Sequence, residues 1–248
     1  MWVEKLVFKH FSKEALINFR TFFKNDYFFL LTHAQLCKSY VHFGLHKTYT
    51  NNNLSRYILG TYYSVSIIDL HKLIYSLRIN LLFLLKIAIK NYISILLIHE
   101  DYKFFKFFGE TYTQLGLDYF FGFWWGGLLK NFRDITHHKP FTYKIYNFKY
   151  NRFPGFVIYI HPAELKHPSS VRLLSKELRM INLLNLCIFD TNVNGKIVDN
   201  WILSNTISFN SSIFWLKIFE LTASKILMLR KKNFLLKIFK DLTNEKTL

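Results

Sequence analysis

The chain has 248 residues, enough for one large domain or two small ones, and 51% of them are hydrophobic, which excludes a mostly disordered chain. Lysine and arginine number 33 against 16 aspartates and glutamates, a formal net charge of +17. Such a basic chain is usually neutralised by a polyanion, with nucleic acid the first candidate and an anionic membrane the second.

The first 35 residues predict an aromatic, helical N-terminal extension. Its opening letters, MWVEKLVFKHF, carry early charge and no uninterrupted apolar core, so they do not indicate a secretory signal. They do not indicate a clear transit peptide either, which fits a protein made inside its own compartment.

From about residue 57 onward, short apolar runs alternate with helical periodicity. The predicted strands are residues 57–59, 65–68, 93–98, 119–123, 156–160 and 186–189. The predicted helices are residues 70–88, 100–116, 128–138, 169–182 and 207–232. Uncharged strands that alternate with helices predict an α/β fold, a three-layer α/β/α sandwich with a mostly parallel, Rossmann-like sheet.

No segment is apolar enough to predict a transmembrane helix. A spanning helix needs about 20 mostly apolar residues. The most apolar stretch, residues 79–98, is interrupted by Lys86 and Lys90. Residues 201–216 carry no charge but contain four serines, two asparagines and a threonine.

Residues 123–133 read FWWGGLLKNFR and predict a turn between a strand and a helix. The glycines, Gly126 and Gly127, allow a tight turn and a close backbone approach. The indoles of Trp124 and Trp125 either close the core over this turn or form a flat surface platform, and the sequence leaves both interpretations open.

Three blocks together resemble a known family. They are HFGLHKTYTNNNLSRYILGTYYSVSIIDL at residues 42–70, the tryptophan–glycine stretch, and FDTNVNGKIVDNWILSN at residues 189–205. In this order and spacing, across residues 38–216, they resemble the bacterial-type small-subunit ribosomal protein S2 family. The resemblance implies a structural protein of the small ribosomal subunit that binds small-subunit rRNA and neighbouring ribosomal proteins, with no catalytic role. Residues 135–154 are too few for the long helical hairpin of bacterial members, so we expect that coiled-coil hairpin to be truncated or absent.

The chain departs from the family pattern at several positions. Family members normally carry arginine and lysine through the stretch that here contains Thr48, Tyr49, Asn53 and Ser55, and arginine at the position of Phe123. Each change removes a positive charge that could bind phosphate.

Enzyme motifs do not occur in the sequence. There is no glycine-rich phosphate loop and no HExxH zinc motif, so we predict no catalytic residues, no cofactor, no metal and no small-molecule substrate. His42 and His46 are four residues apart but have no third ligand at a suitable spacing, which favours a structural or phosphate-facing role. Asp69 and Asp190 each follow a predicted strand, where capping or turn stabilisation is favoured over ribose binding.

The RNA-binding residues that we predict flank two matched turns, one in the block of residues 42–70 and the other in the tryptophan–glycine stretch. The first choices for phosphate contacts are Lys47, Arg56, Lys130 and Arg133, and the second are His42, His46, Tyr49 and Asn51. The basic C-terminal stretch that includes Arg230, Lys231 and Lys232 fits a solvated helix face, an RNA contact or a protein contact equally well.

The predicted organisation has three parts: the extension of residues 1–35, an α/β/α domain of residues 36–216, and a basic helical extension of residues 217–248. The abundance of lysine, asparagine, phenylalanine, tyrosine and isoleucine resembles AT-biased coding, and two isolated cysteines fit a reducing compartment. The composition and the family resemblance together favour a location in the mitochondrial matrix, on the small subunit of the mitoribosome. Two alternatives stay open: a Rossmann-like nucleotide-binding enzyme without its glycine motif, and a peripheral basic membrane-associated protein.

Overall fold

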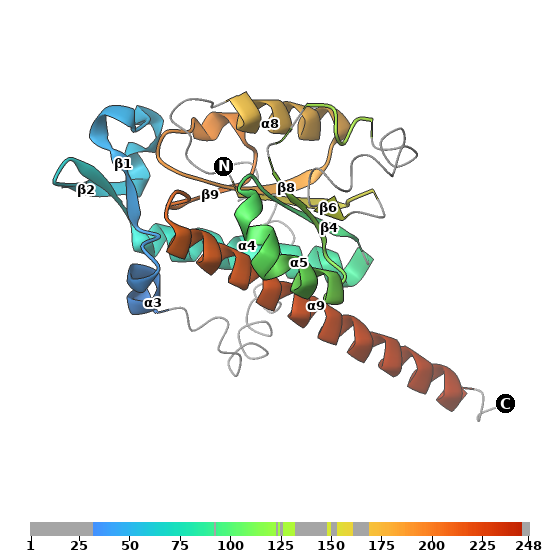
Figure 1. The fold of residues 1–248 in the computed structure, drawn as a ribbon. Coiled ribbons are helices and arrows are strands. Elements are labelled where there is room, and N and C mark those ends of the chain that lie inside the picture. The colour runs from blue at the N-terminus through green and yellow to red at the C-terminus, as the bar shows by residue number, and fades with distance from the viewer. Residues whose placement is uncertain are drawn as a thin grey trace.

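A computed structural model describes residues 32–91, 93–122, 124, 126–131, 148–149, 153–160 and 169–244 (Figure 1). Of the predicted N-terminal extension only the end lies within these ranges, where helix α3 (His33–Lys38) begins behind a capping box formed by Thr32 and Gln35. The prediction of a shortened hairpin refers to residues 135–154, of which only 148–149 and 153–154 lie within them.

The central sheet is built mainly from parallel strands, in the order β6-β5-β4-β7-β8-β9. All neighbouring pairs are parallel except β5 and β6. The strands are β4 (Ile95–His99), β5 (Asp118–Phe121), β6 (Phe148–Lys149), β7 (Phe156–Ile160), β8 (Leu184–Phe189) and β9 (Trp201–Leu203). Every residue of β4 and β7 is buried, as expected for parallel strands covered on both faces.

Helices cover both faces of this sheet, which confirms the predicted three-layer α/β/α architecture. Figure 1 shows α8 (Ser169–Ile181) on one face, and α4 (Leu70–Asn91), α5 (Phe105–Gln114) and α9 (Phe209–Asn244) on the other. The hydroxyl of Tyr112 in α5 donates to the carbonyl of Leu216 in α9 at 2.9 Å, so these two helices are joined by a buried hydrogen bond as well as by packing.

A second, smaller sheet lies beside the first. It consists of β1 (Phe43–His46), β2 (Ile58–Tyr62) and β3 (Val65–Ile68), all antiparallel, in the order β1-β3-β2. The strands predicted at 57–59 and 65–68 are present here, outside the parallel sheet. The reason is the two-residue turn between β2 and β3, because so short a connection can join only antiparallel strands.

Short 3₁₀ helices connect these elements: η2 (Lys47–Tyr49), η3 (Asn52–Tyr57), η4 (Tyr102–Phe104) and η5 (Gly195–Ile197). Asp69 caps α4, as the sequence predicts. Its Oδ1 accepts from the backbone N–H groups of His71 and Lys72 at 3.0 and 3.4 Å, and Oδ2 pairs with the Lys72 ammonium at 3.1 Å.

Helix α9 is longer than the predicted helix of residues 207–232. It runs without a break through residue 216, where we placed the end of the α/β/α domain. Ile218, Phe219, Ala223 and Ile226 are buried, so the first turns beyond that position pack into the core. A helix was also predicted at residues 128–138. Residues 126–131 form a turn, and residues 132–138 lie outside the described residues.

In the part of the chain that the structure describes, no helix combines the length and apolar character that crossing a bilayer requires.

Candidate nucleic-acid interface

The segment from residue 40 to residue 57 packs over the carboxyl ends of β8 and β9. The Leu45 N–H donates to the hydroxyl of Thr191 at 2.9 Å, and the Asn51 N–H donates to the carbonyl of the same threonine at 2.8 Å. On the β9 side, the Asn205 amide donates to the carbonyl of Tyr40 at 2.9 Å. These contacts tie a surface segment to the buried ends of β8 and β9, so its conformation is fixed by the core.

Gly44 explains why this segment fits so closely. A Cβ at this position would lie 2.3 Å from the Ser66 hydroxyl oxygen and 2.6 Å from Cγ2 of Thr191. Any other residue would therefore push β1 away from both β3 and the end of β8. The glycine of the His-Phe-Gly motif is required by this close approach.

Asp190 anchors the same junction from within. Its Oδ1 accepts from the backbone N–H and the hydroxyl of Thr191 at 2.6 and 3.1 Å, and Oδ2 accepts from the Thr206 N–H at 3.4 Å. The carboxyl group is fully buried, and this burial raises its pKa to about 6. The turn-stabilising role predicted for Asp190 is confirmed by these bonds.

The predicted RNA-binding residues on this segment divide into exposed and structural groups. His46, Lys47 and Tyr49 are exposed at the end of β1 and in η2. Asn51 is half-buried, and its side chain caps η3 by accepting from the Asn53 N–H at 3.1 Å. His42 is half-buried too. Burial lowers the pKa of His42, which favours the neutral ring and weakens the case for a phosphate contact.

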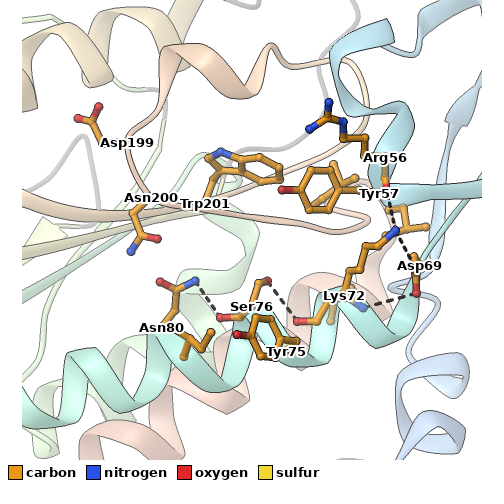
Figure 2. Close-up of a pocket in the computed structure, with 14 residues that line it drawn as sticks. Arg56, Tyr57, Asp69, Lys72, Tyr75, Ser76, Asn80, Asp199, Asn200 and Trp201 are labelled. Atoms are coloured by element: carbon orange, nitrogen blue, oxygen red, sulfur yellow. Dashed lines mark hydrogen bonds and ion pairs between the residues drawn. The ribbon is translucent and has the colours of Figure 1, made fainter. Parts of the chain in front are cut away.

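Arg56 lies on the rim of a pocket of about 680 Å³ (Figure 2). Tyr57 and Trp201 lie on one side of it, with ring centroids 4.9 Å apart, and Tyr75, Ser76 and Asn80 of α4 line the other. The carboxylates near the pocket are already paired, Asp69 with Lys72 and Asp199 with Arg179 at 2.9 Å.

The guanidinium group of Arg56 points away from the Lys72–Asp69 pair (Figure 2). It makes no ion pair with any residue within the described ranges. Lys72 instead donates to the backbone carbonyl of Arg56, which fixes the backbone and leaves the side chain exposed. Arg56 is therefore an exposed cation on a constrained loop.

The tryptophan–glycine turn follows β5, as predicted. Trp124 is buried and packs against Phe120 with ring centroids 5.5 Å apart, so for this indole the core interpretation is correct and the surface platform is wrong. Gly127 has a φ of +96°, a conformation that favours glycine. Trp125 and Arg133 lie outside the described residues.

A buried carboxylate holds this turn together. Glu177 of α8 accepts at Oε2 from the Trp124 indole N–H at 3.3 Å and from the Gly127 N–H at 3.1 Å. Its Oε1 accepts from the N–H groups of Leu129 and Lys130 at 2.6 and 2.8 Å. Lys130 thus uses only its backbone here, and its side chain is exposed.

Sequence reasoning missed Glu177, although a signal was present. The apolar residues Leu174, Leu178 and Ile181 recur at helical spacing in this helix, and Glu177 lies three residues after the first and four before the last. A carboxylate on the apolar face of an amphipathic helix indicates a buried acceptor with dedicated donors. Thr191 belongs to the matched block of residues 189–205, but the sequence did not predict that it would be the hydrogen-bonding partner of β1.

The fold brings the two matched turns to the same edge of the sheet without joining them. The tryptophan–glycine turn follows β5, and the segment that carries Lys47 and Arg56 packs over the end of β8, so both lie at the carboxyl edge of the parallel sheet. The strands β4 and β7 separate β5 from β8, which places the turns roughly 14 Å apart at the usual strand spacing. Lys130 and the pair Lys47 and Arg56 are therefore exposed cations at separate places along one edge.

The described residues contain no group of three histidine, cysteine, aspartate or glutamate side chains placed to hold a metal ion. His42 and His46 differ in environment: the first is half-buried, whereas Nδ1 of the second lies 3.3 Å from the Thr48 N–H that it caps.

Comparison with known proteins gives one family. Residues 36–154 match the model of the family described as ribosomal protein S2. This range contains β1 to β6, η3 with Arg56, and the tryptophan–glycine turn, whereas the block of residues 189–205 lies beyond it. A search of curated proteins found no match. This match over a little under half of the chain and the five-stranded parallel sheet flanked by helices support membership of the ribosomal protein S2 family, the structural proteins of the small ribosomal subunit.

Proposed function

We propose that this chain binds small-subunit rRNA and neighbouring ribosomal proteins as a structural constituent of a mitochondrial ribosome. The observation that carries the proposal is the set of exposed cations on rigid loops of the family-matched segment. Lys47, Arg56 and Lys130 are all exposed, and the backbone of each loop is hydrogen-bonded to the core.

The mechanism is binding by pre-organised charge. Each cation that neutralises a phosphate releases condensed counterions, which favours association at low salt. Because Thr191 and Glu177 fix the two loops before RNA arrives, little backbone entropy is lost on binding. The buried sheet therefore acts as a frame that keeps converging phosphates in register with the lysines and arginines.

The mitochondrial part of the proposal rests on composition. Phenylalanine, tyrosine, lysine, asparagine and isoleucine are abundant and glycine is scarce at 9 residues, a pattern of AT-biased organelle genes. The two described cysteines are unpaired, which fits a reducing matrix.

A catalytic role is less well supported. In doubly wound sheets, nucleotides bind at the carboxyl ends of the strands. Here the carboxyl ends of β8 and β9 are covered by residues 40–51, through the hydrogen bonds of Thr191 and Asn205. The chain itself therefore occupies the space at two of the five parallel strand ends, whereas the topological switch point of this sheet lies between β4 and β7.

The salt dependence of RNA binding tests the proposal. The triple variant Lys47→Gln, Arg56→Gln, Lys130→Gln is compared with the wild type for binding to a small-subunit rRNA transcript at several salt concentrations. The matched control carries Lys103→Gln, Lys106→Gln and Lys217→Gln, three exposed lysines on η4, α5 and α9 that lie outside both turns and give the same change in charge.

We expect the slope of log affinity against log salt to become shallower by about 2 to 3 in the interface variant, because each lost phosphate contact removes about 0.7–0.9. The control variant should keep most of the wild-type slope. Equal loss in both variants would mean that binding follows total charge, and the proposed interface would then be wrong.

A further inference from the structure

The turn between β2 and β3 has an unusual sequence for its geometry. Its two central residues, Tyr63 and Ser64, have φ values of +46° and +63°. A two-residue hairpin turn of this kind strongly favours Asn-Gly or Asp-Gly, since other residues crowd their own backbone there. A tyrosine is held in this conformation at a cost in stability, and such outliers concentrate at functional sites.

The tyrosines of this turn make little use of the protein's own core. Tyr63 is 85% exposed and Tyr62 is 63% exposed, and their rings meet edge to face with centroids 4.5 Å apart. Strand β2 is at the edge of the small sheet, and Figure 1 shows this hairpin projecting from the side of the molecule. Packing therefore does not explain why two large rings are placed there.

A cation and further rings lie at the same tip. The Lys47 N–H donates to the Ser64 carbonyl at 2.8 Å, and His46 pairs with Val65 at the beginning of β3. Tyr49, 53% exposed, follows in η2 with its ring centroid 6.4 Å from that of His46. One end of the small sheet thus presents three tyrosines, a histidine and a lysine.

We propose that this tyrosine tip, defined as His46, Lys47, Tyr49, Tyr62 and Tyr63, binds an unpaired segment of RNA by stacking bases on its tyrosine rings. The inference rests on the proposed function and adds a mode of recognition to it. No charged residue occurs from Tyr57 to Ile68, so the hairpin supplies flat rings while Lys47 supplies the charge for a phosphate. Rings interleaved with cations are the pattern by which proteins hold single-stranded nucleic acid.

Because of the turn geometry, a mutation can remove the Tyr63 ring without destabilising the fold. Asparagine tolerates the left-handed conformation and is favoured in this turn. Tyr63→Asn should therefore remove the ring while leaving the melting temperature at or above that of the wild type. With a fluorescein-labelled decamer of uridine as the probe, we expect the variant to bind about tenfold more weakly.

Two further variants separate stacking from charge and from strain. Lys47→Gln should reduce the salt slope by about 0.7, whereas Tyr63→Asn should leave this slope unchanged, because the ring carries no charge. Tyr40→Asn is the matched control: Tyr40 also has a positive φ, +58°, and is 47% exposed, but it lies before β1, away from the tip. It should bind the decamer as tightly as the wild type.

Each other outcome is decisive. If the full chain binds neither the decamer nor rRNA, the proposed function fails and the inference fails with it. If it binds rRNA but not the decamer, the inference alone is wrong. If the wild type binds but Tyr63→Asn binds equally well, or if Tyr40→Asn loses as much affinity, the inference alone is wrong. Normal RNA binding by Tyr63→Asn together with failed incorporation into subunits would show that the tip contacts a protein, which also overturns it.

Discussion

At the scale of single residues, Glu177 shows how one turn can satisfy a buried carboxylate, with three backbone N–H groups and one indole N–H. Four N–H groups, from Trp124, Gly127, Leu129 and Lys130, converge on its two oxygens. A buried carboxylate is costly without such partners, and the donors would be equally costly to leave unpaired. The carboxylate and the turn therefore depend on each other.

Replacing this carboxylate should destabilise the protein strongly. In Glu177→Ala, four donors lose their acceptor in the interior, and we expect the free energy of unfolding to fall by about 3 kcal/mol or more. Urea unfolding followed by tryptophan fluorescence measures the change. Glu110→Ala, which removes an exposed carboxylate from α5, is the control and should stay within about 0.5 kcal/mol of the wild type. Similar stabilities for the two variants would show that Glu177 does not hold the turn.

Asp190 gives a pH dependence whose sign can be worked out. Burial raises its pKa from 3.8 to about 6, although hydrogen bonds from Thr191 and Thr206 act in the opposite direction. Between pH 6 and pH 4 the folded chain therefore binds a proton more readily than the unfolded chain. The contribution of Asp190 to stability rises as the pH falls through this window, by about 3 kcal/mol at most.

The variant Asp190→Asn isolates this contribution, because its amide cannot titrate. As the pH falls from 6.5 to 4, the free energy of unfolding of the wild type should rise relative to that of the variant. His99 is buried as well, and burial lowers its pKa to about 4, so its contribution to stability falls over the same range. That contribution is common to both proteins and cancels in the difference. A pH-independent difference in urea unfolding would contradict the account.

At the scale of elements, α9 does more than close the sandwich. Arg230 donates from Nη2 to the carbonyl of Ala88 at 2.7 Å and to that of Ile93 at 2.8 Å, with a further bond from Nε to Ala88. These carbonyls belong to the last turn of α4 and the segment that follows it, where cations are favoured by the helix dipole. The sequence left the basic stretch open as a solvated helix face, an RNA contact or a protein contact. Arg230 is none of these, because it caps the C-terminal end of α4 within the same chain.

Arg230→Ala should therefore lower the free energy of unfolding by about 1.5–3 kcal/mol, the range for hydrogen bonds to charged groups. Its neighbour Lys231 is exposed and has the same charge, so Lys231→Ala serves as the control and should change stability by less than about 0.5 kcal/mol. Denaturant titration of both variants provides the measurement. If both variants lost the same stability, α9 would not cap α4 through Arg230.

The elements that could be predicted are those whose signal lies in one continuous run. Strand β7 matches the predicted range of 156–160, and β8 contains the predicted 186–189, because uncharged apolar runs of strand length are distinctive. Strand β1 was missed because FGLH is short and contains Gly44, which local propensity disfavours. Its glycine is explained only by Ser66 and Thr191, residues far away in sequence.

The candidate site was predicted at the level of segments more than of single residues. Exposure of Lys47 and Arg56 follows from their positions in short polar stretches. The structural use of Asn51, the burial of Trp124 and the role of Glu177 depend on tertiary partners that periodicity does not identify. The tip formed by Tyr62 and Tyr63 was also missed, since an apolar run with alternating residues does not reveal which face the fold leaves uncovered.

At the scale of the whole molecule, a net charge of +17 is carried by a fold with a mostly apolar central layer. A protein of this kind gains stability from its sheet and affinity from its surface, so the two properties should respond differently to salt. Burial of apolar residues is little affected by moderate salt, whereas phosphate contacts weaken steeply. The isolated chain should therefore stay folded at salt concentrations at which it leaves RNA.

Sedimentation of a lysate that contains the chain through a sucrose gradient tests the central claim most directly. The account predicts that the chain co-sediments with small-subunit rRNA at moderate salt and is released to the top fractions at high salt. If the chain remains at the top of the gradient under every salt condition, the ribosomal account of this protein is contradicted.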